Sequence, residues 1–163
     1  MENTLQKLNI WKLIISIAIC ELTGIVSSIL SNAIMNPWFN NLVKPSWNPP
    51  SSVFGPVWTV LYVLMGISLW LVWKSNKPTN EKEIAVTFFI LQLFLNFWWS
   101  LLFFKFHLPA LALVDILLLL VLIVITMLHF FRVSKIATYV LIPYVLWVAF
   151  ATVLNYSIWT LNK

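Results

Sequence analysis

Five long apolar segments dominate this chain of 163 residues, and they limit the folds open to it. An α-helix needs about 20 mainly apolar residues to cross the hydrocarbon core of a bilayer, and each segment is long enough to do so. The segments cover approximately residues 10–31, 50–74, 84–104, 109–131 and 136–159. With short connections, five crossings use almost the whole chain. The sequence therefore predicts an all-α integral membrane protein, a single domain that is a bundle of five transmembrane helices.

Composition and charge exclude several other classes of protein. Apolar residues make up 61% of the chain and charged residues only 9%, whereas about 25% of an ordinary soluble domain is charged. No room remains for a soluble catalytic domain. The ten Lys and Arg residues are scattered singly between apolar segments and form no basic patch, which argues against nucleic acid as a partner. We expect them to set topology and to contact lipid head groups of the bilayer.

The connection between the first two helices, residues 32–49, is rich in proline and asparagine and cannot span the membrane. Its prolines fix φ repeatedly, which favours an ordered loop over a flexible linker. Apolar surface on this loop comes from Trp38, Phe39 and Trp47. We therefore expect a cap that lies on the bundle, with Asn48 and Pro49 as the N-cap and first residue of the second helix.

Polar residues inside the apolar segments are the candidates for function. Glu21 and Asp115 are acids at membrane depth, where charged groups are expensive and usually face the bundle interior. A structural role is favoured over proton chemistry for each. The third helix carries a polar stripe that must face protein, ligand or water: Gln92, Asn96 and Ser100. The first helix has a face of small residues suited to close packing: Ser16, Cys20, Gly24 and Ser28.

Ten tryptophans exceed what an interfacial belt requires, and several lie well inside their segments. If successive helices alternate in direction, one half of the bilayer, beneath the loop, holds Trp58, Asn96, Trp99, Asp115, Ala151 and Asn155, with Trp147 near the midplane. Core packing explains any single tryptophan equally well. Together, however, an aromatic and amide lining under an ordered cap predicts a pocket for a flat, large, apolar ligand.

The sequence offers few residues in arrangements typical of a conventional enzymatic site. His107 and His129 are 22 residues apart, which is about 33 Å along a helix, so they cannot share a metal ion. Cys20 is the only cysteine, which excludes an intramolecular disulfide. No Ser-His-Asp arrangement, phosphate loop or GxGxxG motif is present. We expect no metal site and no required cofactor.

Four stretches together resemble the translocator protein family (TspO/MBR), whose members are also called tryptophan-rich sensory proteins or peripheral-type benzodiazepine receptors. The most specific is KPSWNPPSSVFGPVWTVLYVLMGISLWLVWK at residues 44–74. The others are LNFWWSLLFF from Leu95, ALVDILLL around Asp115 and PYVLWVAFATVLNYSIWTLN from Pro143. The resemblance runs from the first loop to the end of the chain.

This resemblance implies a membrane receptor or sensor that binds porphyrins, such as protoporphyrin IX and haem, and isoquinoline or benzodiazepine-type ligands. The alternatives are a tetrapyrrole or sterol transporter and an enzyme-like activity, the light- and oxygen-dependent degradation of porphyrin through Trp58 and Trp147. Family members form homodimers, so a homodimer is also expected. By matching motif positions, the ligand-binding residues would be Phe39, Pro49, Phe54, Trp58, Tyr62, Asn96, Trp99, Trp147, Ala151 and Asn155.

Cholesterol, a ligand of animal members, is not expected for this chain. The proposed sterol motif needs Lys or Arg within a few residues after a tyrosine. Leu154 and Tyr156 are present, but Thr160 stands where animal members carry Arg, and Lys163 comes one residue too late.

Positive charge predicts an orientation in the cell membrane, because Lys and Arg accumulate on the cytoplasmic side. Seven lie at the N-terminus and in the second and fourth connections, against three on the other side: Lys7, Lys12, Lys74, Lys77, Lys82, Arg132 and Lys135, against Lys44, Lys105 and Lys163. The N-terminus is therefore predicted to be cytoplasmic.

Cysteine labelling in intact cells tests this orientation. In Lys44→Cys and Lys77→Cys variants, an impermeant maleimide should label position 44 and leave position 77 unlabelled until the cells are opened. The reverse pattern would invert the predicted orientation.

Overall fold

The computed structural model describes residues 2–163, with side chains from Ile10 onward. Throughout this range it contains helices and no strand, and five spans are long and apolar enough to cross a membrane. This confirms the predicted all-α membrane fold. In chain order the elements are α1 (Glu2–Ser31), α2 (Pro37–Asn41), α3 (Ser51–Trp73), α4 (Thr79–Ser100), the π-helical turn η1 (Leu101–Lys105), α5 (Pro109–Val133), α6 (Lys135–Val140) and α7 (Ile142–Leu161).

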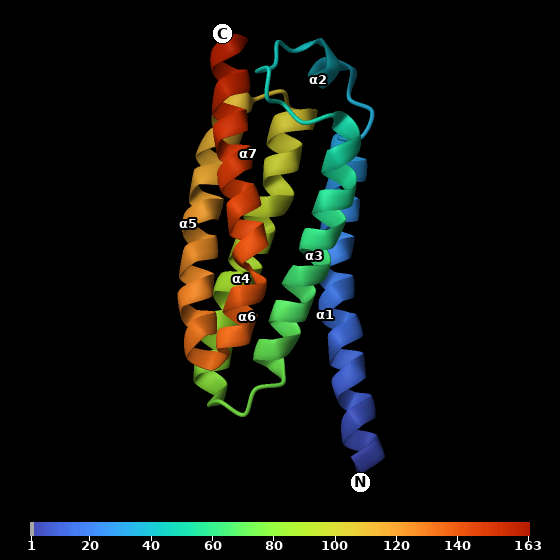
Figure 1. Ribbon diagram of the computed structural model, residues 1–163, viewed down its shortest axis with the longest axis vertical. Coiled ribbons are helices and arrows are strands. Elements are labelled where there is room, and N and C mark those ends of the chain that lie inside the picture. Colours follow the sequence, from blue (N-terminus) through green and yellow to red (C-terminus); the bar gives the residue numbers. More distant parts are fainter. Residues whose placement is uncertain (1) are drawn as a thin grey trace.

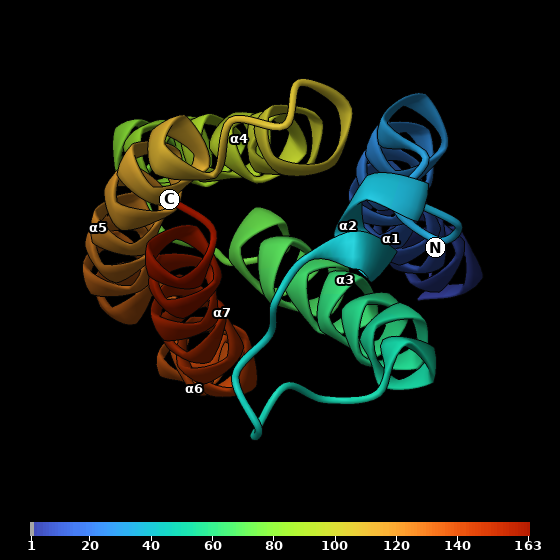
Figure 2. The ribbon, with the colours of Figure 1, turned by 90° about the horizontal axis from the view of Figure 1, so that it is seen from above.

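The long helices stand side by side, and consecutive ones run in opposite directions (Figure 1). Viewed along the bundle, α4 lies between α1 and α5, while α7 lies beside α5 and α3 lies between α7 and α1 (Figure 2). The loop with α2 covers one end, where α1 ends and α3 begins, and the α3–α4 connection lies at the opposite end (Figure 1). We call these the capped end and the open end.

Helix boundaries differ from the apolar segments where sequence outside the hydrocarbon core is also helical. α4 begins at Thr79, five residues before the predicted start at 84, and the added turn is polar. Apolarity marks only the part of a helix inside lipid.

The last segment is broken into α6 and α7 at Leu141, whose N–H donates to the Thr138 carbonyl at 3.0 Å. Pro143 follows in the first turn of α7, where it needs no N–H partner.

The predicted cap of the second helix, with Asn48 as N-cap and Pro49 as first residue, was wrong. α3 begins at Ser51 after Pro50, and no side chain caps it. Asn48 instead donates from Nδ2 to the Pro49 carbonyl at 2.8 Å. Pro49 is itself followed by a proline, which disfavours the helical conformation for it, so the helix cannot begin there.

A hydrogen-bonded junction joins the ends of α1 and α4 at the capped end. The hydroxyls of Ser31 and Ser100 lie 2.8 Å apart, and both side chains are buried. Directly beyond Ser100, α4 widens into η1, and His107 then adopts a φ of 56° that ends the helix. The His107 ring stacks on Trp38 of the loop at 4.4 Å, so this turn also supports the cap.

Two glycines allow α1 and α3 to pack closely. A Cβ added to Gly66 would lie 2.5 Å from Cα of Ile17, which is backbone and cannot move aside. A Cβ added to Gly24 would lie 2.1 Å from the ring of Tyr62. Ser16 and Cys20, two members of the small face, are fully buried on the same side of α1. Small residues at such contacts let helix backbones approach in lipid, where no hydrophobic effect drives association.

We predict that Gly66→Ala destabilises the bundle by about 1–3 kcal/mol, because the added methyl group would push the α1 and α3 backbones apart. The matched control is Gly55→Ala on the same helix, since nothing lies within 4 Å of a Cβ at that position. The midpoint of unfolding in a detergent titration, followed by circular dichroism, should fall for Gly66→Ala alone. Equal midpoints would show that this contact does not limit packing.

Candidate functional site

A cavity of about 680 Å³ lies beneath the loop at the capped end of the bundle. Its walls come from α1, α3, the end of α4 with η1, and α7, and α2 contributes from above. This volume is within the range of small-molecule pockets, about 300–1,000 Å³. We call it the aromatic cavity because Phe, Trp and Tyr side chains form much of its wall.

Nine of the ten residues proposed from the sequence line this cavity, and Pro49 does not. The nine are Phe39, Phe54, Trp58, Tyr62, Asn96, Trp99, Trp147, Ala151 and Asn155. For the residues on the long helices, this convergence follows from helical periodicity combined with alternating helix direction. On α3, Phe54, Trp58 and Tyr62 are four residues apart and share one face near the start of the helix. Trp147, Ala151 and Asn155 share the corresponding face toward the end of α7.

The loop is fastened at two points, so it forms a fixed cover. Asn36 caps α2 by accepting from the Phe39 N–H at 3.0 Å, and its Nδ2 donates to the Phe104 carbonyl at 2.8 Å. Phe39 is buried against the rings of Phe103 and Phe104. Further along the loop, both backbone groups of Val43 bond to the amide of Asn162 at 2.9 Å. These contacts hold the cover to η1 and to the end of α7.

Below the cavity, four buried polar side chains form a hydrogen-bonded chain across three helices. Tyr62 on α3 donates to Oδ1 of Asn96 on α4 at 2.5 Å. The amide of Asn96 donates to the hydroxyl of Tyr144 on α7 at 3.2 Å, and Tyr144 donates to Oε1 of Gln92 at 2.7 Å. The polar stripe predicted on the third helix therefore faces protein, and two of its members form this floor.

The amide of Asn155 is occupied by structural bonds. It accepts from Nε1 of Trp99 at 3.0 Å and donates to the Pro109 carbonyl at 2.8 Å. Trp99 is therefore held by its N–H while its ring stacks on Phe103 at 5.5 Å. These two residues give the cavity a fixed aromatic wall, with their polar groups already satisfied.

Two polar groups on the cavity wall have no hydrogen-bond partner among the described residues. Oε1 of Glu21 and Nε1 of Trp147 are both buried, and both residues line the cavity. The Glu21 carboxylate accepts hydrogen bonds when ionised and the Trp147 indole N–H donates one, so both groups can orient a bound molecule. A buried polar group without a partner costs free energy, and a ligand that supplied the partner would recover it.

Sequence reasoning missed part of this site. Glu21 was singled out as a buried acid but was not assigned to the pocket, and Ser27, Asn36 and Phe103 were not singled out as pocket residues. The repeat of small residues on α1 was the available signal, because Gly24 and Ser28 also line the cavity. Asp115, the other acid, is buried on α5 and is not among the lining residues.

The chemistry of the lining favours binding over conventional catalysis. Among the described residues that line the cavity there is no histidine or cysteine, and Glu21 is the only carboxylate. In the part of the chain that the structure describes, no group of three His, Cys, Asp or Glu residues could hold a metal ion. The arrangement can enclose a flat apolar molecule between aromatic rings and offer it a few fixed polar groups.

Comparison with known proteins gives consistent matches over nearly the whole chain. The sequence model of the TspO/MBR family matches residues 16–160. The Tryptophan-rich protein TspO of Chlorobaculum tepidum is 44% identical over 150 residues, which cover 92% of this chain and 95% of that protein. The human Translocator protein is 41% identical over 126 residues, covering 77% and 75%. The Tryptophan-rich sensory protein of Cereibacter sphaeroides is 34% identical over 134 residues, covering 81% and 82%.

Proposed function

Because this chain belongs to the TspO/MBR family of membrane proteins, we propose that it is a membrane receptor that binds porphyrins in the aromatic cavity. Protoporphyrin IX and haem are the proposed ligands, together with isoquinoline or benzodiazepine-type molecules. By sequestering porphyrin the protein would act as a sensor and affect the level or transport of tetrapyrroles. The observation that carries this proposal is a covered cavity with aromatic walls, which nine of the ten sequence-proposed residues line.

The walls suit a flat conjugated ligand. Trp58 contacts Tyr62 and Tyr144 with ring centroids 5.7 and 6.4 Å apart, and Phe54 packs edge-on against Trp147 at 6.0 Å. Rings held in this way present faces and edges to an aromatic ligand, and offset or edge contacts of this type are favourable. The unpaired N–H of Trp147 could donate to a ligand acceptor.

Porphyrin degradation is the second candidate function, and it rests on one observation. Trp58 and Trp147 both line the cavity in which a porphyrin would bind. A porphyrin excited by light could take an electron from a neighbouring indole, with dioxygen as the oxidant that is consumed. This reaction requires no metal and no general base, in keeping with the lining residues.

The distribution of basic residues between the two ends of the bundle bears on its orientation in the membrane. Among the basic residues whose side chains the structure describes, six lie at the open end of the bundle and three at the capped end: Lys12, Lys74, Lys77, Lys82, Arg132 and Lys135, against Lys44, Lys105 and Lys163. This supports a cytoplasmic open end in the cell membrane. A homodimer and vectorial transport remain proposals that rest on family resemblance alone, and cholesterol is not proposed as a ligand.

Filling the cavity should weaken binding while the fold is retained. We predict that Ala151→Phe lowers the affinity for protoporphyrin IX at least about tenfold, which corresponds to about 1.4 kcal/mol. The control is Val153→Phe on the same helix, because Val153 is 56% exposed on the outer surface. Binding is measured by equilibrium titration of the purified, monodisperse variants. Equal affinity in both variants would place the ligand outside this cavity.

Replacing the two indoles separates binding from photochemistry. Trp58→Phe and Trp147→Phe keep an aromatic ring but remove the readily oxidised indole. We predict that they retain most of the porphyrin binding and lose light-dependent product formation, measured by chromatography after illumination in oxygen. Wild-type binding together with a wild-type rate of degradation in both variants would exclude these tryptophans as reactants.

A further inference from the structure

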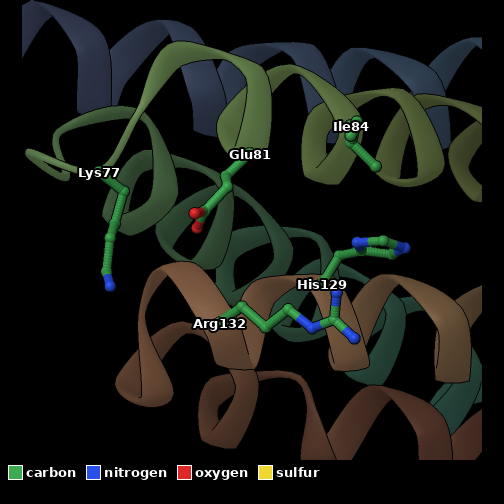
Figure 3. Close-up of a pocket in the computed structure, with 5 residues that line it drawn as sticks. All are labelled: Lys77, Glu81, Ile84, His129 and Arg132. Atoms are coloured by element: carbon green, nitrogen blue, oxygen red, sulfur yellow. The ribbon is translucent and has the colours of Figure 1, made fainter.

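A second cavity, of about 440 Å³, lies at the open end between the start of α4 and the end of α5. It is lined by Lys77, Glu81, Ile84, His129 and Arg132 (Figure 3). None of these residues lines the aromatic cavity, which lies beneath the loop at the other end of the bundle (Figure 1). We call it the interfacial cavity, and its function is independent of the function proposed above.

Three charged side chains line this cavity, and none of them forms an ion pair with another. Lys77, Glu81 and Arg132 are exposed, and among the described residues their charged groups make no ion pair or hydrogen bond. In Figure 3 the carboxylate of Glu81 points into the space between the two helices, with the ends of Lys77 and Arg132 to either side of it. The cavity therefore offers two positive groups and one negative group. The simpler explanation of these exposed charges would be that they are solvated side chains at the ends of helices and bind no ligand.

Depth in the membrane distinguishes this cavity from an ordinary solvated surface. Thr79 and Val133 are the ends of two membrane spans, so the cavity lies where hydrocarbon gives way to head groups. Ile84, 47% exposed, lies about 4.5 Å deeper along α4 than Glu81 at the helical rise of 1.5 Å per residue. Phe88 follows one turn further and stacks on His129 at 4.9 Å. The charged groups thus lie at the membrane surface and the apolar groups below them.

We propose that the interfacial cavity binds the head group of an ethanolamine phospholipid. Its phosphate would accept hydrogen bonds from Lys77 and Arg132, its ammonium would donate to Glu81, and an acyl chain would run inward over Ile84. Glu81 determines the specificity. A carboxylate between two cations opposes a simple anion, and it accepts hydrogen bonds from an ammonium group, which a quaternary choline cannot donate.

Lipid association with the full-length protein tests the proposal. The protein is reconstituted in nanodiscs of phosphatidylcholine that contain a small fraction of spin-labelled phosphatidylethanolamine, phosphatidylglycerol or phosphatidylcholine. The immobilised fraction of each label gives its relative association. We expect the ethanolamine lipid to exceed both others by about two- to fivefold, as for exposed ion pairs. Equal association of all three, or preference for phosphatidylglycerol, would overturn the proposal.

Substitutions then identify the groups responsible. Arg132→Gln and Lys77→Gln should reduce association of the ethanolamine lipid, and Glu81→Gln should remove its advantage over phosphatidylcholine. The control is Lys135→Gln, because Lys135 lies at the same end but over the Phe131 ring, outside the cavity lining. An equal effect of the control, or no effect of the three variants, would overturn the assignment.

A soluble competitor distinguishes a lipid from free phosphate. Inorganic phosphate in excess should leave the immobilised fraction of the ethanolamine lipid unchanged, because it supplies neither the ammonium nor the acyl chain. Full displacement by inorganic phosphate would make this a general anion site and contradict the proposal.

Discussion

The requirement that polar groups be satisfied inside a bilayer shapes this structure more than any other constraint. The chain of hydrogen bonds from Tyr62 through Asn96 and Tyr144 to Gln92 meets that requirement for three helices at once. Leaving one of these groups unpaired would cost about 1–3 kcal/mol, so the chain fixes how α3, α4 and α7 face one another. The floor of the aromatic cavity lies at this chain. Above it, aromatic side chains share the same helix faces with a few polar ones such as Ser100 and Asn155, and the loop covers the space between the helices.

Rigidity of that space comes from contacts on every side. Gly66 brings α1 against α3, Asn155 holds Trp99, and Asn36 and Asn162 fasten the loop at two points. Asparagine is repeatedly the residue that joins elements, since its short amide can donate and accept together. A pocket so constrained can be ordered before a ligand enters, which lowers the entropy lost on binding.

Much of this arrangement follows from the sequence, and the exceptions have physical causes. Segment length and apolarity predict five spans, and alternating helix direction predicts that Trp58, Asn96, Trp99, Trp147, Ala151 and Asn155 lie together, as they do in the cavity. Phe39, Phe54 and Tyr62 were proposed from the family resemblance, and they line the same cavity. Pro49 lies outside because its position depends on loop conformation, which periodicity does not describe. The predicted Asn48–Pro49 cap of α3 was wrong because Pro50 disfavours a helical conformation for Pro49. Glu21 and the interfacial cavity depend on which helix faces meet, and a single sequence does not specify those pairings.

Binding of a flat apolar ligand in the aromatic cavity can be followed by tryptophan fluorescence. Trp58, Trp99 and Trp147 line the cavity, so protoporphyrin IX bound there should quench their emission. If the ligand binds in this cavity, purified protein should show saturable quenching with one ligand per chain. An isoquinoline competitor should reverse the quenching, and cholesterol should not produce it. Quenching that rises without saturation, or that persists unchanged with excess competitor, would contradict binding in this cavity.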